Sequence, residues 1–406
     1  MNRPRLRYVE AFPVDYQGQR LICLRDPQNL SGKMLFVSSE ALFIISQFDG
    51  KHSIIDIQET FMRQFGNFIF RDEIDGLINQ LDEALMLDSE TYRNFKIKLE
   101  EEFKNSFVRK SSHAGLSYPP EAAEVRKWLS DFFEKAEQSH PAKTDNGKIS
   151  GIVSPHIDFR RGGHSYALAY RELINSDADT FIIFGSSHYA EVENHFILTK
   201  KNFLTPLGEA ETDTKIVEEL TRHCNWDLFE GEIFHRQEHS IEFQVVFLQH
   251  LFGDKKKFKI VPILCNSFFS MIHNGKSPRE DGNVSTFLNL IGDLISYKNG
   301  AFVIAGADMA HVGLKFGDTE PVGESTLTWI KERDLLSLSF TENIDAEGFF
   351  RSVEVEKDKR KICGLSPIYA LLSTIKAEKG KLLHYDQALE PDTGSVVSYA
   401  SVGFYS

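Results

Sequence analysis

Hydrophobic and polar positions follow two different patterns along this chain of 406 residues. In the first pattern, from Arg20 to about Lys96, short apolar runs precede three stretches with apolar residues at helical spacing. The runs LICLRDP and KMLFVS predict two strands, and SSEALFIISQFDG, IIDIQETFMRQFG and RDEIDGLINQLDEALMLD predict three amphipathic helices. Ser39 is the predicted N-cap of the first helix and Gly50 its stop, and the third stretch is predicted to end in a strand. This order of elements predicts a small winged-helix-like unit.

The second pattern begins near His113, where the apolar runs become richer in β-branched residues. Four runs, KISGIVSPH, DTFIIFGSSH, KFKIVPILC and GAFVIAGAD, are continuous rather than alternating, which is typical of strands buried on both faces. Amphipathic stretches such as SYALAYRELIN and TDTKIVEELTRHC lie between them and predict helices. The pattern therefore predicts an α/β domain with a central sheet.

The change of pattern predicts two domains, residues 1–105 and residues 106–406. Residues 97–112 are rich in charge and predict a connecting helix or a linker. The polar stretch SFFSMIHNGKSPREDGN, residues 267–283, is predicted to be a surface loop.

Candidate chemistry gathers where three of the predicted strands end. The first run ends at His156, the second at Ser187 and His188, and the fourth at Asp308, with His311 three residues later. A single histidine after a strand is more often a loop residue that finds a hydrogen bond, but three such ends among four strands form a stronger pattern. Because functional residues of open α/β sheets gather just past the carboxyl ends of the strands, we expect these side chains to converge.

A dense group of imidazoles and carboxylates, HRQEHSIE, precedes the predicted helix FQVVFLQHLF. One interpretation is structural: Glu238 or Ser240 caps the helix, and its dipole favours the acids. The other is functional: Glu238, His239 and Glu242 orient ligand histidines or act as a general acid or base. The spacing is not HExxH, so a zincin-type protease site is not supported.

The four cysteines are far apart and form no CxxC pair, which argues against a disulfide framework and favours the cytoplasm. Cys363 precedes a predicted helix in KICGLSPIYALL, where a thiolate with a lowered pKa suits a nucleophile or a metal ligand. The net charge of −13 argues against a broad nucleic-acid or anionic-membrane surface. Neither a signal peptide nor a membrane span of 18 or more apolar residues is predicted.

A series of short motifs runs through residues 111–406. They are HAG from His113 with YP from Tyr118, SPH ending at His156, GSSH ending at His188, TPLG from Thr205 with Asp213, EHSIE from Glu238, ADMAHVG from Ala307, ICG from Ile362 with PI from Pro367, and SVVSYAS from Ser395. Taken together, these motifs resemble the Memo family, whose bacterial members are called AmmeMemoRadiSam system protein B. In the N-terminal part, the pattern FDG…SIIDI…LDEALMLD resembles the peptide-binding domains of the PqqD type.

The resemblance to the Memo family implies a fold like that of the class III extradiol dioxygenases, which bind ferrous iron through two histidines and a carboxylate. In Memo proteins a cysteine occupies the carboxylate position, so the implied metal ligands are His156, His188 and Cys363. The implied pocket residues around the metal are Asp308, His311 and His239. The strand ends by themselves would favour Asp308 over Cys363 as the third ligand.

Two imidazoles and one thiolate leave open positions on a metal and suit ferrous iron, with copper or zinc as alternatives. The chain departs from the family pattern after the first ligand, where an acid and arginines follow. Asp158, Arg160 and Ser187 are predicted to lie at the pocket, where the two charged residues would alter the charge of what binds.

Three functions remain open from the sequence. The first is a metal-dependent redox enzyme, in which His239 or His311 would be the acid or base and Asp308 would orient a histidine. The second is a metal carrier or accessory protein; the resemblance implies a radical SAM protein and an AMMECR-type protein as partners and a peptide at the N-terminal domain. The third is a peptide-binding protein with a vestigial pocket, since a fold does not fix a function.

Overall fold

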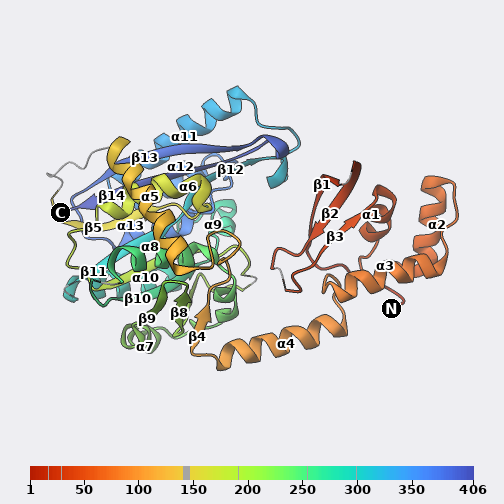
Figure 1. The fold of residues 1–406 in the computed structure, drawn as a ribbon, viewed down its shortest axis with the longest axis horizontal. Coiled ribbons are helices and arrows are strands. Elements are labelled where there is room, and N and C mark those ends of the chain that lie inside the picture. Colours follow the sequence, from red (N-terminus) through yellow and green to blue (C-terminus); the bar gives the residue numbers. More distant parts are fainter. Residues whose placement is uncertain (17, 29, 140–146, 191, 254, 299) are drawn as a thin grey trace. The chain divides into compact units, whose positions relative to one another are not determined.

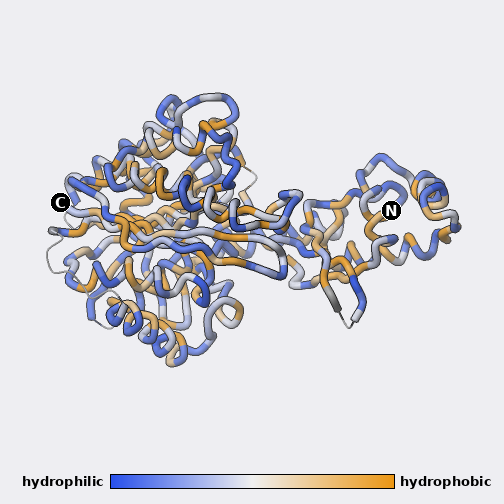
Figure 2. The backbone as a smooth tube through the Cα atoms, turned by 90° about the horizontal axis from the view of Figure 1, so that it is seen from above, coloured by the Kyte–Doolittle hydropathy of each residue, from blue (hydrophilic) through white to orange (hydrophobic). Residues whose placement is uncertain are grey.

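The computed structural model describes residues 1–16, 18–28, 30–139, 147–190, 192–253, 255–298 and 300–406. They form two compact units, Met1–Asn105 and Ser106–Ser406, whose elements are labelled in Figure 1. Each unit has a hydrophobic core of its own, and Figure 2 shows hydrophobic segments concentrated inside each. No helix among the described residues is both long and apolar enough to cross a lipid bilayer.

The first unit is a three-stranded antiparallel sheet followed by helices, with the strand order β1-β2-β3. Its elements are β1 (Glu10–Tyr16), β2 (Gln19–Arg25), β3 (Met34–Val37), α1 (Ser39–Ser46), α2 (Ile54–Phe65), α3 (Arg71–Glu83) and α4 (Glu90–Asn105). The two predicted strands and three predicted helices are all present, but the sequence pattern missed β1. This strand contains Pro13, which weakens a strand pattern and is tolerated here because β1 lies at the edge of the sheet.

Three details of this unit differ from the prediction. Ser38, not Ser39, caps α1, because its backbone is extended and its hydroxyl accepts the N–H of Ala41 at 3.2 Å. The same helix ends at Ser46, before the expected stop at Gly50. The strand expected after α3 is only an isolated bridge at Leu87, because the left-handed Leu85 turns the chain.

The second unit is built on a sheet of eleven described strands, with the path β12-β14-β5-β11-β6-β10-β9-β8-β4 and with β13 and β7 paired to β14 and β10. The strands are β4 (Val108–Lys110), β5 (Ile149–Ser154), β6 (Thr180–Ser186), β7 (Phe196–Leu198), β8 (Asn202–Thr205), β9 (Gly208–Thr212), β10 (Lys259–Cys265), β11 (Ala301–Gly306), β12 (Asp308–Gly313), β13 (Lys379–Glu390) and β14 (Ser395–Tyr405). The four predicted strands are β5, β6, β10 and β11, which lie side by side and are parallel.

The continuous apolar runs are explained by helices on both faces of this sheet. The helices are α5 (Ala122–Ser139), α6 (Phe159–Arg171), α7 (Thr214–His223), α8 (His239–Phe252), α9 (Phe269–Asn274), α10 (Gly282–Tyr297), α11 (Glu324–Glu342), α12 (Ala346–Glu354) and α13 (Leu365–Thr374). Along β6, Phe181 and Ile183 pack in the core that contains α5, α6 and α8. The alternate residues Ile182 and Phe184 pack in the core that contains α7, α10 and α13. The prediction of an α/β domain with a central sheet is confirmed.

The prediction of a surface loop at residues 267–283 is wrong. The segment contains α9 and a 3-10 turn at Pro278–Glu280, and it leads directly into α10. Phe268, Met271 and Ile272 within it are buried in the core on the α10 and α13 face of the sheet. The segment is mostly polar, but these three apolar residues have the spacing of one face of a short helix, and the sequence prediction did not detect it.

Candidate metal centre

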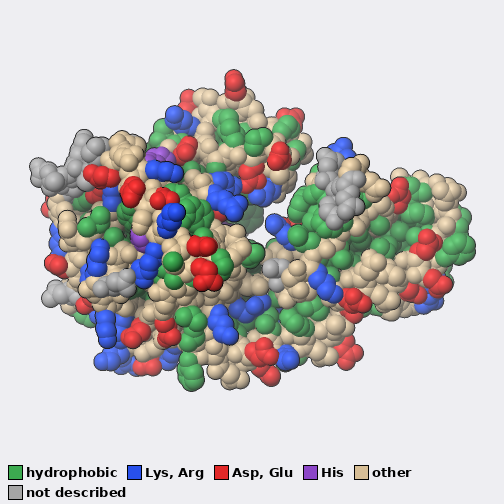
Figure 3. Space-filling model, viewed as in Figure 1, with side chains coloured by type: hydrophobic (Ala, Val, Ile, Leu, Met, Phe, Trp, Pro, Cys, Tyr) green, Lys and Arg blue, Asp and Glu red, His purple; other side chains and the backbone are tan. Residues whose placement is uncertain are grey.

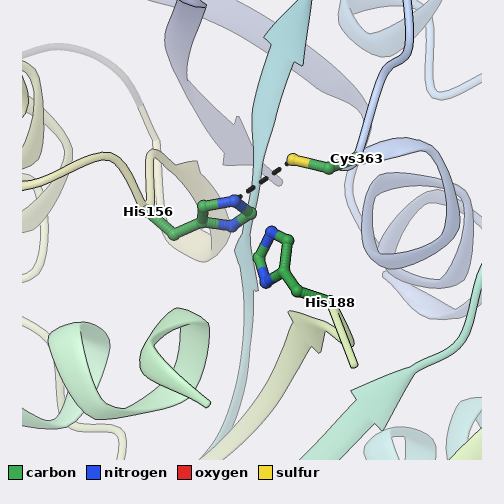
Figure 4. A group of neighbouring side chains, drawn as sticks. All are labelled: His156, His188 and Cys363. Carbon is green, nitrogen blue, oxygen red and sulfur yellow. Dashed lines mark hydrogen bonds between the residues drawn. The ribbon is translucent and has the colours of Figure 1, made fainter. Parts of the chain in front are cut away.

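Two histidines and a cysteine meet at the carboxyl edge of the parallel strands. His156 lies two residues beyond β5 and His188 two residues beyond β6, while Cys363 comes from the turn before α13. A nitrogen of each imidazole and the sulfur of Cys363 lie within 4.8 Å of one another. Figure 4 shows the three side chains pointing toward a common point. The expected convergence of strand ends is therefore present, with Cys363 as its third member.

His156 is held by groups from the strand next to it. Its Nδ1 lies 2.9 Å from the carbonyl oxygen of Gly306, and its backbone N–H donates to Asp308 at 2.9 Å. A protonated Nδ1 donates to that carbonyl, which leaves Nε2 facing the sulfur of Cys363 at 3.1 Å. The ring is almost completely buried, so its orientation is set by the protein.

His188 is held by a buried carboxylate at the start of α8. Glu238 accepts its backbone N–H at 2.9 Å and lies 3.0 Å from its Nδ1. The same carboxylate caps α8 by accepting the N–H groups of His239 and Ser240, so the predicted capping role is confirmed. The rings of His188 and His239 stack with their centroids 4.9 Å apart. One acid thus caps a helix and orients two imidazoles.

Cys363 is positioned by contacts of its own backbone with two strand ends. The Ser186 hydroxyl donates to the carbonyl of Cys363 at 2.8 Å. The N–H of the next residue, Gly364, donates to the carbonyl of Asp308 at 3.1 Å. A Cβ on Gly364 would lie 2.3 Å from that carbonyl oxygen, so only glycine permits this approach.

The electrostatics of the three side chains favour a thiolate among imidazoles. Burial by itself raises the pKa of a thiol, but the charges of His156 and His311 hold the pKa of Cys363 well below its usual value. Burial likewise opposes charge on His188, yet the Glu238 carboxylate raises the pKa of that imidazole well above its usual value. The thiolate favours positive charge on the neighbouring imidazoles, which protons supply when no metal is bound. A metal cation bound at the same atoms would displace those protons.

A family model described as Memo-like protein matches residues 109–403. The chain belongs to the Memo-like family. A MEMO1 family protein of Aquifex aeolicus is 30% identical over 407 residues, covering 99% of this chain and 100% of that protein. A MEMO1 family protein of Thermoplasma acidophilum is 28% identical over 298 residues, covering 72% of this chain and 97% of that protein. The protein memo-1 homolog of Caenorhabditis elegans is 27% identical over 329 residues, covering 76% and 87% of the two chains.

The comparisons confirm the family that the motifs resembled. Because the Aquifex match covers 99% of this chain, it extends over both units, whereas the family model lies within the second unit. The Aquifex relative is therefore similar in sequence over the residues of both units.

Asp308, His311 and His239 lie around the three candidate ligands of this Memo-like domain. Asp308 is buried, and one of its oxygens is 3.7 Å from Nε2 of His156. Burial raises the pKa of Asp308, and the neighbouring Cys363 thiolate adds to the effect. Burial and the neighbouring imidazoles lower the pKa of His239 to about 4, although Glu238 opposes the shift, so His239 is neutral near pH 7.

Glu242, predicted to orient a ligand or act as an acid or base, has a different environment. Its two oxygens accept hydrogen bonds from the Arg109 guanidinium, the Tyr118 hydroxyl, the backbone N–H groups of Ser112 and His113 and the Ser112 hydroxyl. All of these partners lie in residues 109–118, near the start of the second unit. The geometry therefore gives Glu242 an anchoring role.

The three predicted pocket residues have different surroundings. Asp158 caps α6 by accepting the N–H groups of Arg160 and Arg161, and it forms an ion pair with the Arg161 side chain. Arg160 is exposed. Ser187 does line a cavity beside Cys363.

Sequence reasoning missed Arg360, which is completely buried one turn before Cys363. Its guanidinium is 2.6 Å from Asp334 and also pairs with Glu356, and its carbonyl accepts the His311 N–H at 2.7 Å. The surrounding sequence EKDKRK looks like a solvated charge run, so no local signal marks this arginine as buried.

Proposed function

We propose that this Memo-like protein binds ferrous iron through His156, His188 and Cys363 and uses it in a redox reaction on a small molecule. The observation that carries the proposal is the convergence of three donor atoms within 4.8 Å of one another. Each donor is oriented by buried or backbone groups rather than by solvent, as is usual for ligands of a protein metal site.

The chemistry of the donor set fits such an ion. Nδ1 of His156 is engaged by the Gly306 carbonyl and Nδ1 of His188 by Glu238, so both imidazoles have Nε2 left for a metal. The thiolate form that a metal requires is favoured at Cys363. Three protein ligands leave positions for a substrate, and a soft thiolate with two imidazoles suits iron, copper or zinc rather than magnesium or calcium.

Residues around these ligands can take part in proton movement. Iron bound here would supply electron exchange with a molecule held in its remaining positions. The neutral His239 can accept a hydrogen bond or a proton from that molecule, and Glu238 fixes its ring at 3.2 Å. Asp308 lies 3.7 Å from Nε2 of His156 and accepts the backbone N–H of the same residue at 2.9 Å.

Metal analysis of protein purified under reducing, anaerobic conditions tests the ligand set. After reconstitution with Fe(II), copper or zinc, the wild type should hold close to one ion per chain. Cys363→Ser and His188→Ala should each lower the affinity by about 10-fold or more, since changes to the outer partners of ligands already cost that much. Cys224→Ser, at a buried cysteine outside the cluster, is the matched control and should bind like the wild type.

Wild-type metal content in both ligand variants, or no uptake of any of the three metals by the wild type, would refute the ligand set. The redox part is tested by oxygen uptake with a panel of catechol-type substrates. Tight binding without turnover on any metal would leave a metal carrier as the function.

A second candidate function, an accessory role in a radical SAM system, is favoured by the edge of the first unit. Among the described strands β3 pairs with β2 alone, and its residues Met34 and Phe36 are 55% and 42% exposed. An extended peptide can add to such an edge as a further strand. We propose this edge as the binding site for a peptide, with a radical SAM protein and an AMMECR-type protein as the candidate partners.

Co-purification of these two proteins with the full chain and with residues 106–406 tests the accessory role. Loss of a partner on truncation is the expected result. If the shorter chain retains every contact, recruitment through the first unit is excluded.

A further inference from the structure

A cavity of about 770 Å³ lies beside the candidate metal centre in the second unit. Cys363 and Ser187 line it on the side of the metal ligands. Its volume falls within the range of pockets that hold small organic molecules. The chemistry of its remaining walls therefore bears on what the site acts on.

One wall carries an excess of positive charge. Lys357, Lys359 and Lys361, all from the turn that precedes Cys363, line the cavity. Lys361 is neutralised by Asp318 at 2.6 Å, whereas Lys357 and Lys359 form no ion pair with any acidic side chain of the described residues. Acidic and basic side chains are mixed over the face drawn in Figure 3, and the chain is acidic as a whole, so the positive excess at this wall is opposite in sign to the net charge of the molecule.

The acids of the lining reduce the positive charge but do not cancel it. Asp358 also lines the cavity and accepts the N–H of Ile362 at 2.9 Å, so three lysines face two acids, Asp318 and Asp358, which leaves an excess of one positive charge. Glu356 forms an ion pair with the buried guanidinium of Arg360. The sequence EKDKRK has two acids and four bases. In the fold, Arg360 pairs with Glu356 in the interior, whereas Lys357 and Lys359 line the cavity.

The turn that presents these lysines is held in an uncommon backbone conformation. Lys357, Asp358 and Lys361 have φ values of 52°, 51° and 51°, which residues other than glycine rarely adopt. Such residues persist only where the surrounding structure imposes them, and they gather at functional sites. Arg360, in the same turn, is completely buried and pairs with Asp334, which ties the turn to the core.

Helices α9, α11 and α13 contribute aromatic and apolar side chains to the lining of the same cavity. Phe269 and His273 of α9 lie with their ring centroids 4.2 Å apart, and Phe269 is 55% exposed. Trp329 of α11 and Leu365 of α13 add further apolar surface. The cavity therefore offers cations at one wall and an aromatic surface at another.

We infer that this cavity binds a small organic carboxylate with an aromatic body. The carboxylate pairs with Lys357 and Lys359, and the body packs against Phe269 and Trp329. The inference rests on the proposed function, because it names the class of substrate that would reach a metal at Cys363.

The test uses the full-length protein, with and without Fe(II), and a matched pair of probes. These are 3-phenylpropionate and its neutral amide, 3-phenylpropionamide, titrated by calorimetry. The carboxylate should bind about 10-fold more tightly than the amide, the order expected from two partly exposed ion pairs. The preference should disappear in the double variant Lys357→Met/Lys359→Met.

The matched control is Lys256→Met/Lys257→Met. These two lysines line a different cavity beside β9 and β10, so their removal should leave the preference unchanged. Phe269→Ala should weaken both probes alike, by about 3-fold to 10-fold, because it removes apolar contact without changing charge.

Equal affinity of the wild type for the two probes, or no binding of either, would overturn the inference. So would an undiminished carboxylate preference in the Lys357 and Lys359 variant. A preference that depends on Fe(II) but not on these lysines would show the carboxylate on the metal, which contradicts the lysine assignment while supporting the metal. A lysine-dependent preference in a protein that takes up no metal would support the cavity and refute the proposed function.

Discussion

Two buried glutamates lie one helical turn apart at the start of α8 and have opposite surroundings. The carboxylate of Glu238 is shared by the imidazoles of His188 and His239. The carboxylate of Glu242 is bound by Arg109 and four further donors. Burial disfavours the charge of both acids, yet these partners lower the pKa of both carboxylates below the usual value.

The difference shows that burial and a lowered pKa do not by themselves mark a functional acid. Both acids belong to the same motif, EHSIE, and the sequence treats them alike. Their partners separate them: Glu238 holds groups that can bind a metal, whereas the oxygens of Glu242 are fully used by donors that anchor the chain. Matched substitutions at the two positions should therefore damage different properties.

The largest expected effect is the loss of stability in Glu242→Gln. The change leaves the buried Arg109 guanidinium without a counter-charge, which costs roughly 3–5 kcal/mol. Urea unfolding should show this loss, while the metal affinity of the folded protein stays near the wild-type value. A loss below about 1 kcal/mol would mean that the arginine finds another partner.

Glu238→Gln should instead weaken metal binding, by about 10-fold to 100-fold. Glutamine is neutral and no longer favours the orientation and basicity that Glu238 imposes on His188. Competition with a chelator measures the affinity, and Glu242→Gln serves as the control. If both variants lose the same affinity, the comparison between the two acids fails.

The pH dependence of stability should separate wild type and Glu242→Gln in acid. Burial raises the pKa of Glu242, but Arg109 outweighs it, so the folded pKa lies below that of the unfolded chain. The ionised Glu242 therefore stabilises the folded protein fully above its unfolded pKa of about 4.3. This stabilisation is lost as the pH falls from there toward the folded pKa. Urea midpoints below about pH 4.3 should fall more steeply for the wild type; parallel slopes would exclude Glu242 as the source.

The smallest effect is expected for Arg160→Ala. Arg160 is exposed on α6, so its removal should change the free energy of unfolding by less than about 0.5 kcal/mol. Metal affinity and the binding of 3-phenylpropionate should also match the wild type. A change in either would support the predicted place of Arg160 at the pocket.

Much of this arrangement could be predicted before the fold was known. The four apolar runs predicted the parallel strands, and their ends predicted that His156 and His188 converge. Cys363 entered the ligand set through the resemblance to the Memo family, because a lone cysteine before a helix is weak evidence. The structure then brings its sulfur to 3.1 Å from Nε2 of His156.

Two features that local composition did not predict share a physical cause. Residues 267–283 are mostly polar, yet three apolar residues among them fold α9 onto the core. Asp158 and Arg160 follow a candidate ligand directly in sequence, but helix α6 begins there and uses the acid as its cap. Local composition predicts neither outcome, because each depends on what the segment packs against.

Local periodicity in the sequence was enough to predict the four buried strands, the amphipathic helices and the residues at the strand ends. Long-range packing decided which buried acid faces imidazoles and which faces arginine. It also decided that Arg360 turns inward while Lys357 and Lys359 line the cavity. The reason is that hydrophobic spacing acts between near neighbours, whereas the partner of a buried charge comes from a segment distant in the chain.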